Sequence, residues 1–282
     1  MGGGLKPDMK VSVNGTIFEQ KDALVSIADK AVWYDFGVYE NIKVLQGKIM
    51  WPEMHTYRLF KSAEIIGLHI GEEKERILQW VRNYAEVQKL KDHIIKICVY
   101  GDADKNARAT VYMFAIGLTF YPDQFYAQGV KAITYQGERN FPTAKSMDTL
   151  VNFIAFRTAK ERGAFEAILI DREGNAREGS RSNLYIVEKE TIITPPLEDV
   201  LEGVTRVLVL KLLEENEIPF KEERISKDRL MAADEIFITA TSSNVMSVTE
   251  IDQQKIGAGA PGEATKQIIQ LYRTMQKEYL GR

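Results

Sequence analysis

Short apolar runs rich in β-branched residues alternate in irregular order with amphipathic helical segments, and this order constrains the fold most. A doubly wound parallel sheet would need strands and helices in regular succession. Strands or hairpins are predicted at residues 10–20, 41–51, 93–101, 109–120, 130–138, 165–171, 182–195 and 235–243. Helices are predicted at residues 52–66, 72–90, 149–162, 203–217 and 262–280. The mixture predicts an α+β fold.

The segment Tyr121 to Gly129, "YPDQFYAQG", contains turn-forming residues and shows no periodicity. It is therefore predicted to be an interdomain linker. Residues 1–120 are expected to form a small N-terminal domain, and residues 130–282 a larger C-terminal domain. The helix at 149–162 is expected to have Asp148 as its cap and Gly163 as its end.

Charge and residue counts exclude several classes of protein. A formal net charge of -3 provides no basic field for nucleic acid, so none is expected as a partner. Cys98 is the only cysteine, and His55, His69 and His93 lack metal-ligand spacing, so no disulfide and no metal site are predicted. The sequence shows no apolar run long enough to span a bilayer, and the first ten residues lack the apolar core of a signal peptide. A cytoplasmic protein without membrane contact is the simplest interpretation.

Two familiar motifs are weak in this sequence. Gly257, Gly259 and Gly262 satisfy G-x-G-x-x-G before a helix, but a dinucleotide site also needs an acidic residue at the end of a following strand. The residues that follow are helical in pattern, which favours a turn and a helix start. A serine hydrolase would need a G-x-S-x-G elbow, which the sequence lacks. Cys98 lies in an apolar strand and is interpreted as a core residue.

Four polar clusters fall at the ends of predicted elements, namely "HTYRL" (55–59), "REGSRSN" (177–183), "EGVTR" (202–206) and "ITATSSN" (238–244). Each alone is more typical of a turn, a cap, a strand end or an exposed helix. In "EGVTR", however, Gly203 precedes a helix, and the free amides of Val204 and Thr205 can hold a phosphate at the positive end of the helix dipole. Further phosphate ligands could come from Thr239, Thr241 and Arg58.

Lys145 and Glu178 narrow the choice of ligand. A lysine can form a Schiff base with an aldehyde when its amine is neutral. A carboxylate can keep a pyridine nitrogen protonated, which makes the ring an electron sink. Together with a phosphate cup, these two residues are typical of a pyridoxal 5'-phosphate (PLP) site.

On these residues the sequence resembles the class IV aminotransferases, the fold-type IV PLP enzymes that include D-amino acid and branched-chain aminotransferases. The resemblance runs from about residue 30 to the C-terminus. Its motifs, in family order, are "GVYE", "HTYRL", "TAKSMDTL", "FEAILIDREGNAREGSRSNLYIV", "TPPLEDVLEGVTR", "ADEIFITATSSNVMSVTEID" and "GEATKQIIQLY". It implies a small α+β domain, a larger α/β pseudo-barrel domain, a cofactor between the two, and a homodimer that completes each site.

The resemblance also implies a role for each matching residue. Lys145 would be the Schiff-base lysine and acid–base catalyst, and Glu178 the partner of the pyridine nitrogen. Tyr39 in "GVYE" matches an aromatic position on the substrate side. The phosphate cup would consist of Arg58, Val204, Thr205 and Thr241. The implied reaction is a ping-pong transfer of an amino group from an amino acid to a 2-oxo acid such as 2-oxoglutarate.

The substrate class is indicated less directly. "YENIK" at 39–43 is more similar to D-amino acid transaminases than to branched-chain enzymes, which usually carry F-E-G-I-R. D-amino acid enzymes commonly bind the substrate carboxylate with R-x-H, whereas "DADKNARAT" offers Arg108 and Thr110 at that spacing. Arg181 in "EGSRSN" is our hypothesis for a replacement carboxylate ligand.

Three alternatives to a D-amino acid aminotransferase remain open. A branched-chain L-amino acid aminotransferase and a lyase of the 4-amino-4-deoxychorismate type share the resemblance. A binding or structural protein that kept the fold is the third, and the presence of Lys145 and Glu178 argues against it.

Overall fold

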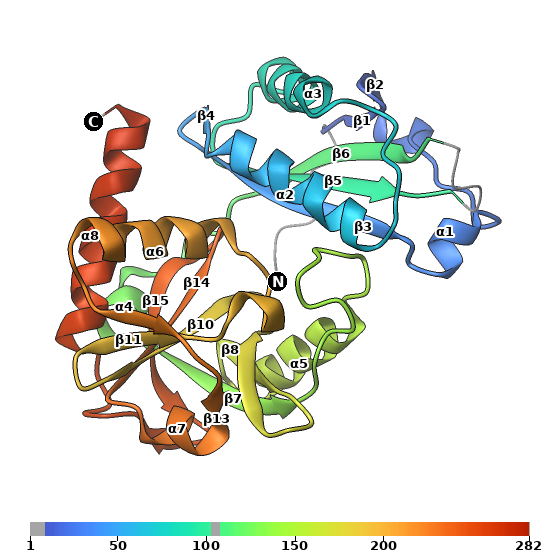
Figure 1. Cartoon of the computed structure of the whole chain (residues 1–282). Coiled ribbons are helices and arrows are strands. Elements are labelled where there is room, and N and C mark those ends of the chain that lie inside the picture. Colours follow the sequence, from blue (N-terminus) through green and yellow to red (C-terminus); the bar gives the residue numbers. More distant parts are fainter. Residues whose placement is uncertain (1–8, 103–107, 282) are drawn as a thin grey trace. The chain divides into compact units, whose positions relative to one another are not determined.

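The computed structural model describes residues 9–102 and 108–281 and divides the chain into two compact units (Figure 1). The first unit holds residues 1–120 and 144–148, and the second holds 121–143 and 149–282. The start of the chain, residues 1–8, and the centre of "DADKNARAT", residues 103–107, lie outside the described residues. The segment predicted as a linker falls in the second unit and contains helix α4 (Asp123–Gln128). This helix was missed because six residues are too few to show a helical period.

The first unit is built on an antiparallel sheet with the strand order β2-β1-β6-β5-β3-β4. Its strands are β1 (Val11–Val13), β2 (Thr16–Phe18), β3 (Gly37–Leu45), β4 (Lys48–Ile49), β5 (His93–Tyr100) and β6 (Thr110–Gly117). Its helices are η1 (Gln20–Asp22), α1 (Lys30–Trp33), α2 (Pro52–Ile65) and α3 (Lys74–Val87). The predicted helices at 52–66 and 72–90 are confirmed.

Two tight turns fix the predicted hairpins of this sheet. Asn14 and Gly15 join β1 to β2, and Gln46 and Gly47 join β3 to β4, with positive φ at all four residues. Two consecutive residues with positive φ are typical of type I′ turns, whose twist matches that of antiparallel strands. Both hairpins are confirmed.

The two faces of strand β3 have different neighbours. Val38, Ile42 and Val44 point into the apolar core beneath α2 and α3. Residues alternate between faces along a strand, so Tyr39 and Lys43 lie on the opposite face. Tyr39 therefore lies on the face of β3 that is turned away from this core.

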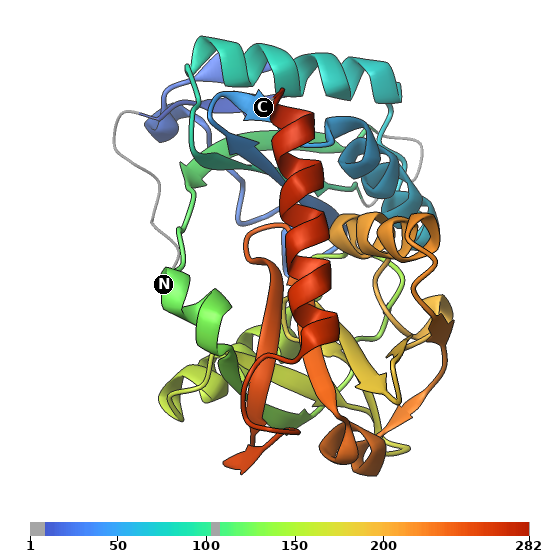
Figure 2. The same ribbon diagram turned by 90° about the vertical axis from the view of Figure 1, so that its left-hand side faces the viewer.

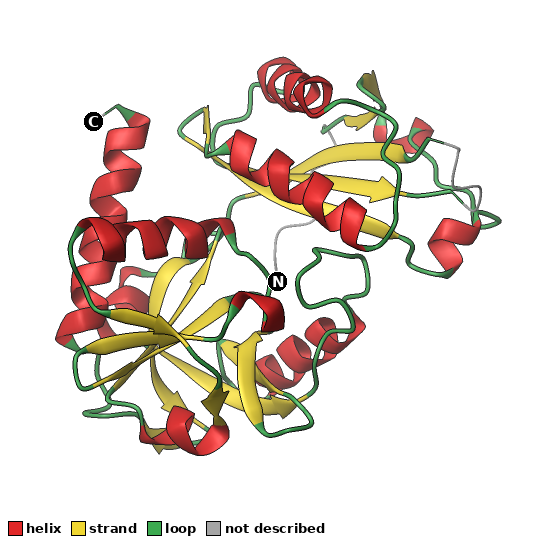
Figure 3. Ribbon diagram, in the orientation of Figure 1, coloured by secondary structure: helices red, strands yellow, loops and turns green. Residues whose placement is uncertain are grey.

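The second unit contains a larger mixed sheet, with the order β12-β11-β10-β14-β15-β7-β8-β9-β13. The strands are β7 (Val130–Gln136), β8 (Glu166–Ile170), β9 (Asn175–Gly179), β10 (Asn183–Glu188), β11 (Thr191–Thr194), β12 (Phe220–Glu222), β13 (Ile225–Ser226), β14 (Glu235–Ala240), β15 (Asn244–Ile251) and β16 (Gln254–Lys255). Its other elements are α5 (Leu150–Glu161), η2 (Leu197–Asp199), α6 (Val204–Glu215), α7 (Lys227–Ala232) and α8 (Glu263–Leu280). Figure 3 shows helices and strands mixed in both units, which confirms the α+β class.

An additional pairing between β9 and β10 closes this sheet. Glu178 on β9 lies opposite Asn183 on β10, so β10, β14, β15, β7, β8 and β9 form a continuous circuit. Closure removes exposed sheet edges and gives the predicted pseudo-barrel. The predicted strand at 182–195 is in fact two strands, because Lys189 and Glu190 form a turn with positive φ.

Helices cover the barrel on the outside. α6 and α8 pack on β14, and α8 also packs on β15 and on α6, as Figure 2 shows for the long C-terminal helix. α5 packs on β7 and β8. The cap of α5 is Thr149 without a side-chain hydrogen bond, so the prediction of an Asp148 cap was wrong by one residue. Within the described residues, no helix is long and apolar enough to cross a membrane.

Candidate active site

The segment that carries Lys145 pairs with strand β3 of the first unit. Val38 and Ser146 form an antiparallel bridge, and the Tyr39 N–H donates to the Lys145 carbonyl at 2.9 Å. The Lys145 N–H donates to Ser62 Oγ on α2 at 3.0 Å. Backbone contacts to a strand and a helix therefore hold Lys145 in the first unit, although the surrounding sequence belongs to the second.

The amine of Lys145 faces an aromatic ring. Its Nζ lies 4.4 Å from the centre of the Tyr39 ring. Among the residues that the structure describes, no carboxylate lies within ion-pair distance of this amine. Tyr39 also has Lys96 nearby, with Nζ 5.7 Å from the ring centre. The structure thus brings together the predicted Schiff-base lysine and the predicted substrate-side tyrosine.

Arg58, a predicted phosphate ligand, is held by a buried carboxylate. Its Nε donates to Glu40 Oε1 at 2.6 Å and its Nη2 donates to Glu40 Oε2 at 2.8 Å. His55 Nδ1 lies 2.8 Å from Glu40 Oε2. A guanidinium has five N–H donors, so Arg58 can hold Glu40 and an anion at the same time.

Burial shifts the pKa values of Glu40 and His55 in opposite directions. Burial opposes ionisation of Glu40, but Arg58 and His55 outweigh it and hold the Glu40 pKa well below its usual range. Burial lowers the pKa of His55, against the attraction of Glu40. The Glu40 carboxylate is therefore a permanent counter-charge for Arg58.

In the second unit, Glu178 is oriented by an arginine that we did not single out from the sequence. Arg139 Nε donates to Glu178 Oε1 at 2.7 Å, and both side chains are 8% exposed. Arg139 Nη2 also donates to the Pro142 carbonyl. A charged, oriented carboxylate is what a protonated pyridine nitrogen requires.

The predicted phosphate-binding turn lies beside Glu178. Gly203 caps α6 without a side-chain hydrogen bond, which leaves the amides of Val204 and Thr205 to an external acceptor. The Leu201 N–H donates to Glu178 Oε2 at 3.3 Å. The loop before α6 therefore contacts the predicted ring-nitrogen partner directly.

The two threonines of "ITATSSN" have different positions. Thr239 lies in β14 and is buried opposite Asn183 of β10. Thr241 follows the end of β14 and is half-buried. Helix α6 packs on β14, and Thr241, which directly follows β14, belongs to the same unit as the α6 turn.

Arg181, our candidate carboxylate ligand, is exposed. Its guanidinium carbon lies 3.5 Å from the centre of the Phe156 ring on α5. Stacking uses the face of a guanidinium and leaves its edge for hydrogen bonds, so the role in carboxylate binding stays a prediction. Arg108, the other residue compared with the R-x-H pair, lies 3.5 Å from Glu72 through Nη1.

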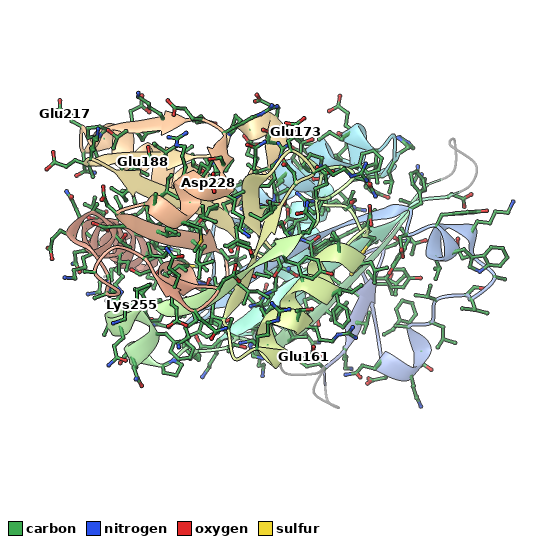
Figure 4. The ribbon with its side chains drawn as sticks, turned by 90° about the horizontal axis from the view of Figure 1, so that it is seen from below. Glu161, Glu173, Glu188, Glu217, Asp228 and Lys255 are labelled. Atoms are coloured by element: carbon green, nitrogen blue, oxygen red, sulfur yellow. The ribbon has the colours of Figure 1, made fainter. Side chains whose placement is uncertain are left out.

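The second unit also has a buried carboxylate at Glu166, unlike the many carboxylates on its surface. Glu166 is buried and accepts hydrogen bonds from Ser180 Oγ, and from Ser182 Oγ at 2.9 Å. Figure 4 labels the surface residues Glu161, Glu173, Glu188, Glu217, Asp228 and Lys255, which lie on the outside of this unit. The serines of "EGSRSN" thus fix the turn that follows Glu178 onto a second buried carboxylate.

The predicted site residues therefore form two sets. The first unit holds Lys145, Tyr39 and Arg58, and the second unit holds Glu178, Arg181, Val204, Thr205 and Thr241. Local motifs identified most of these residues. Arg139, Glu40 and Asn183 were not singled out, because their contacts are made across 39, 18 and 18 residues of sequence respectively.

Comparison with known proteins places this arrangement among related chains. The family described as "Amino-transferase class IV" matches residues 37–251. A D-alanine aminotransferase of Bacillus licheniformis is 36% identical, with 92% of this chain and 94% of the relative covered. A branched-chain-amino-acid aminotransferase of Pseudomonas aeruginosa is 30% identical, with coverage of 92% and 90%. The crystal structure of a branched-chain aminotransferase of Thermoproteus uzoniensis with norvaline has a TM-score of 0.86 at 30% identity, covering 94% of this chain and 93% of that one.

Proposed function

Since the chain belongs to the class IV aminotransferases, we propose that it transfers the amino group of a D-amino acid to a 2-oxo acid such as 2-oxoglutarate, with PLP as cofactor. The observation that carries the proposal is Lys145. Its amine lies over Tyr39 and, among the described residues, has no carboxylate within ion-pair distance. Transamination needs such an amine, both to hold an aldehyde and to move a proton.

The residues present fit this cofactor. The uncapped first turn of α6 suits a phosphate, and Glu178, oriented by Arg139, suits a pyridinium N–H. When bound, PLP supplies the electron sink for the carbanion formed at the substrate's α-carbon. Lys145 would hold the aldehyde, Val204 and Thr205 the phosphate through backbone N–H, and Arg58 and Thr241 its remaining oxygens.

The chain's own groups then perform the proton chemistry. Lys145 Nζ, released when the substrate amine takes its place, would remove the substrate α-proton and deliver a proton to the former aldehyde carbon in the same half-reaction, and it would move a proton in the opposite direction in the second half-reaction. Glu178 is held in place by the ion pair with Arg139, so its carboxylate would stay oriented through both half-reactions. Tyr39 lies next to Nζ and limits the directions from which the amine can approach the substrate.

A D-amino acid is favoured by two observations. The pattern "YENIK" on β3 resembles D-amino acid transaminases, and the Bacillus licheniformis relative, at 36% identity, is a D-alanine aminotransferase. The second candidate is a branched-chain L-amino acid aminotransferase, favoured by the similarity to the Pseudomonas aeruginosa enzyme and to the fold of the Thermoproteus uzoniensis enzyme. A PLP lyase of the 4-amino-4-deoxychorismate type is a more distant third.

A homodimer is also part of the proposal. In the first unit, large apolar side chains are exposed at Leu24, Ile27, Trp33 and Tyr34. In the second, Leu150 and Phe153 of α5 are 66% and 59% exposed. Exposed apolar groups of this size are typical of a protein interface. Light scattering on the purified protein tests this part.

The function is tested by half-reactions with single amino acids. The PLP-loaded protein is mixed with D-alanine, D-glutamate, L-leucine or L-isoleucine, and the absorbance of the lysine-bound cofactor is followed. A fast fall with D-amino acids and formation of pyridoxamine phosphate support the proposal. A response to the branched-chain L-amino acids alone establishes the second candidate. Release of product without pyridoxamine phosphate indicates the lyase.

A further inference from the structure

We propose that Asn183 is a positioning residue that fixes the first turn of α6 relative to Glu178, and so matches the phosphate site to the ring-nitrogen site. The inference rests on the proposed function, because it concerns how the same site holds its cofactor. In PLP the distance from the phosphate to the ring nitrogen is fixed by covalent bonds. A protein that uses both groups must therefore keep its two binding elements at a constant separation.

The first link in this arrangement is the backbone of Leu201. Its N–H donates to Glu178 Oε2 at 3.3 Å, and its carbonyl accepts from Asn183 Nδ2 at 2.8 Å. The Gly203 N–H donates to the same carbonyl at 2.8 Å. The backbone of one residue, Leu201, thus connects Glu178, Asn183 and the cap of α6.

The second link is steric. A Cβ atom added to Gly203 would overlap with Asn183 Oδ1. The backbone of Gly203, with φ -63° and ψ 134°, is one that any residue adopts, so conformation alone does not require glycine here. The glycine is required because the Asn183 amide lies directly against it. Asn183 therefore determines how closely the α6 turn can approach the barrel.

The position of Asn183 in the sheet makes it a rigid support. It pairs with Glu178 on one side, at the place where the barrel closes, and with Thr239 on the other. Its exposure is only 5%. The backbone of Asn183 is fixed between two strands, and its buried side chain is held by the bond to Leu201. Its contacts to Leu201 and Gly203 therefore fix the start of α6 relative to the closed barrel.

The test compares two ligands that differ only in the phosphate. Dissociation constants of PLP and of pyridoxal are measured for wild type, Asn183→Ala, Gly203→Ala and the double variant, together with thermal unfolding of each cofactor-free protein. We expect Asn183→Ala to weaken PLP about tenfold and pyridoxal less than twofold, because the loss is confined to the phosphate turn. Gly203→Ala should show the same selectivity, because its methyl group displaces the turn.

The double variant provides the decisive comparison. Without the Asn183 amide, a methyl group at residue 203 meets no obstacle, so Gly203→Ala should add little to Asn183→Ala. Asn216→Ala is the matched control, because it removes the same kind of bond, from Nδ2 to the Leu212 carbonyl at 2.8 Å, at the other end of α6. It should leave the ratio of the two dissociation constants unchanged.

Other outcomes overturn the inference. Equal weakening of PLP and pyridoxal by Asn183→Ala would mean a general loss of structure, and additive effects in the double variant would mean that the two residues act separately. If Asn183→Ala does not fold, Gly203→Ala alone decides, since an unchanged ratio in that variant refutes the proposal. A wild-type protein that binds neither ligand contradicts the proposed function instead.

Discussion

Each unit of the molecule contains a buried ion pair between an arginine and a glutamate. The two pairs differ in which partner has hydrogen-bonding capacity left for a ligand. In the first unit, Glu40 is fully buried, and both of its oxygens contact Arg58 or His55. In the second unit, the Glu178 side chain is 8% exposed. Its Oε1 accepts from Arg139, and its Oε2 accepts one long hydrogen bond, at 3.3 Å, from the Leu201 N–H. The same ion pair therefore supports opposite roles.

The difference shows why an ion pair alone does not identify a functional group. Both oxygens of Glu40 already accept strong hydrogen bonds, so Glu40 acts by positioning Arg58. The Arg58 guanidinium has more N–H donors than the bonds to Glu40 use. Glu178 has one weakly bonded oxygen, so it can accept a hydrogen bond from a further strong donor. Arg139 acts by positioning Glu178. We expect substitutions of Glu40 to affect stability first, and substitutions of Glu178 to affect catalysis first.

The largest expected effect belongs to Glu178→Gln. A neutral amide cannot stabilise a protonated pyridine nitrogen, so we expect kcat to fall by about 10²–10³-fold, or roughly 3–4 kcal/mol. The free energy of unfolding should fall by less than in Glu40→Gln, because Glu178 accepts fewer hydrogen bonds than Glu40. Steady-state kinetics beside calorimetry measure both quantities. Glu188→Gln is the control and should keep full activity, because Glu188 is a surface carboxylate that accepts hydrogen bonds from Arg229 Nε and Nη2. A Glu178→Gln protein with normal kcat would end the assigned role.

The reverse pattern is expected for Glu40→Gln. It leaves the buried Arg58 guanidinium beside a neutral amide, and breaking a buried ion pair in this way costs about 3 kcal/mol of unfolding free energy. Urea unfolding of the cofactor-free protein measures this. Glu53→Gln on the same helix as Arg58 removes an exposed pair with Arg82 and should cost less than about 0.5 kcal/mol. If Glu40→Gln and Glu53→Gln are equally stable, the Glu40 cluster is not the support we describe.

The two pairs also show what the sequence could and could not predict. Lys145, Glu178 and the "EGVTR" turn are recognisable because each has its chemistry in a few consecutive residues. Arg139 had no such signal, because its hydrogen bond to Glu178 joins residues 39 positions apart in the sequence. The barrel closes where Glu178 pairs with Asn183, which is close by in the sequence, but the polar strand β9 has no apolar pattern that would reveal this pairing.

The secondary-structure elements were likewise predictable only where their signal was local in the sequence. Hairpins with Asn14-Gly15 and Gln46-Gly47 were predictable, since turn chemistry is local. The polar strand β9 and the six-residue helix α4 were not, because neither has an apolar period that distinguishes it from a loop. Tertiary contacts decide such segments.

Strand β3 offers a second contrast with Glu40. Burial lowers the pKa of Lys43 to about 8, so the charged form of Lys43 is disfavoured in the folded protein, unlike that of Glu40. The unfolded protein binds more protons than the folded one between about pH 8 and the unperturbed pKa of 10.5. The stability penalty is therefore fully present below pH 8 and disappears as the pH rises above 10.5.

Lys43→Met should remove this penalty. We expect the variant to be more stable than wild type by about 2 kcal/mol at pH 7, with the difference shrinking between pH 8 and pH 10.5. Urea unfolding across this pH range measures the difference. Lys48→Met, at an exposed position of β4, is the control and should show no such dependence. A constant difference at all pH values would contradict the assignment to Lys43.

The smallest expected effect is that of Arg139→Lys, which separates the charge of the supporting residue from its geometry. A lysine keeps a positive charge near Glu178 but cannot reproduce the planar guanidinium that also donates to the Pro142 carbonyl. We expect kcat to fall about tenfold with little change in unfolding free energy, because Glu178 keeps a counter-charge but loses its fixed orientation. Arg58→Lys, in which the arginine is itself the proposed phosphate ligand, should instead weaken PLP binding with a smaller change in kcat. If both variants change the same parameter to the same extent, the opposite roles assigned to the two pairs are wrong.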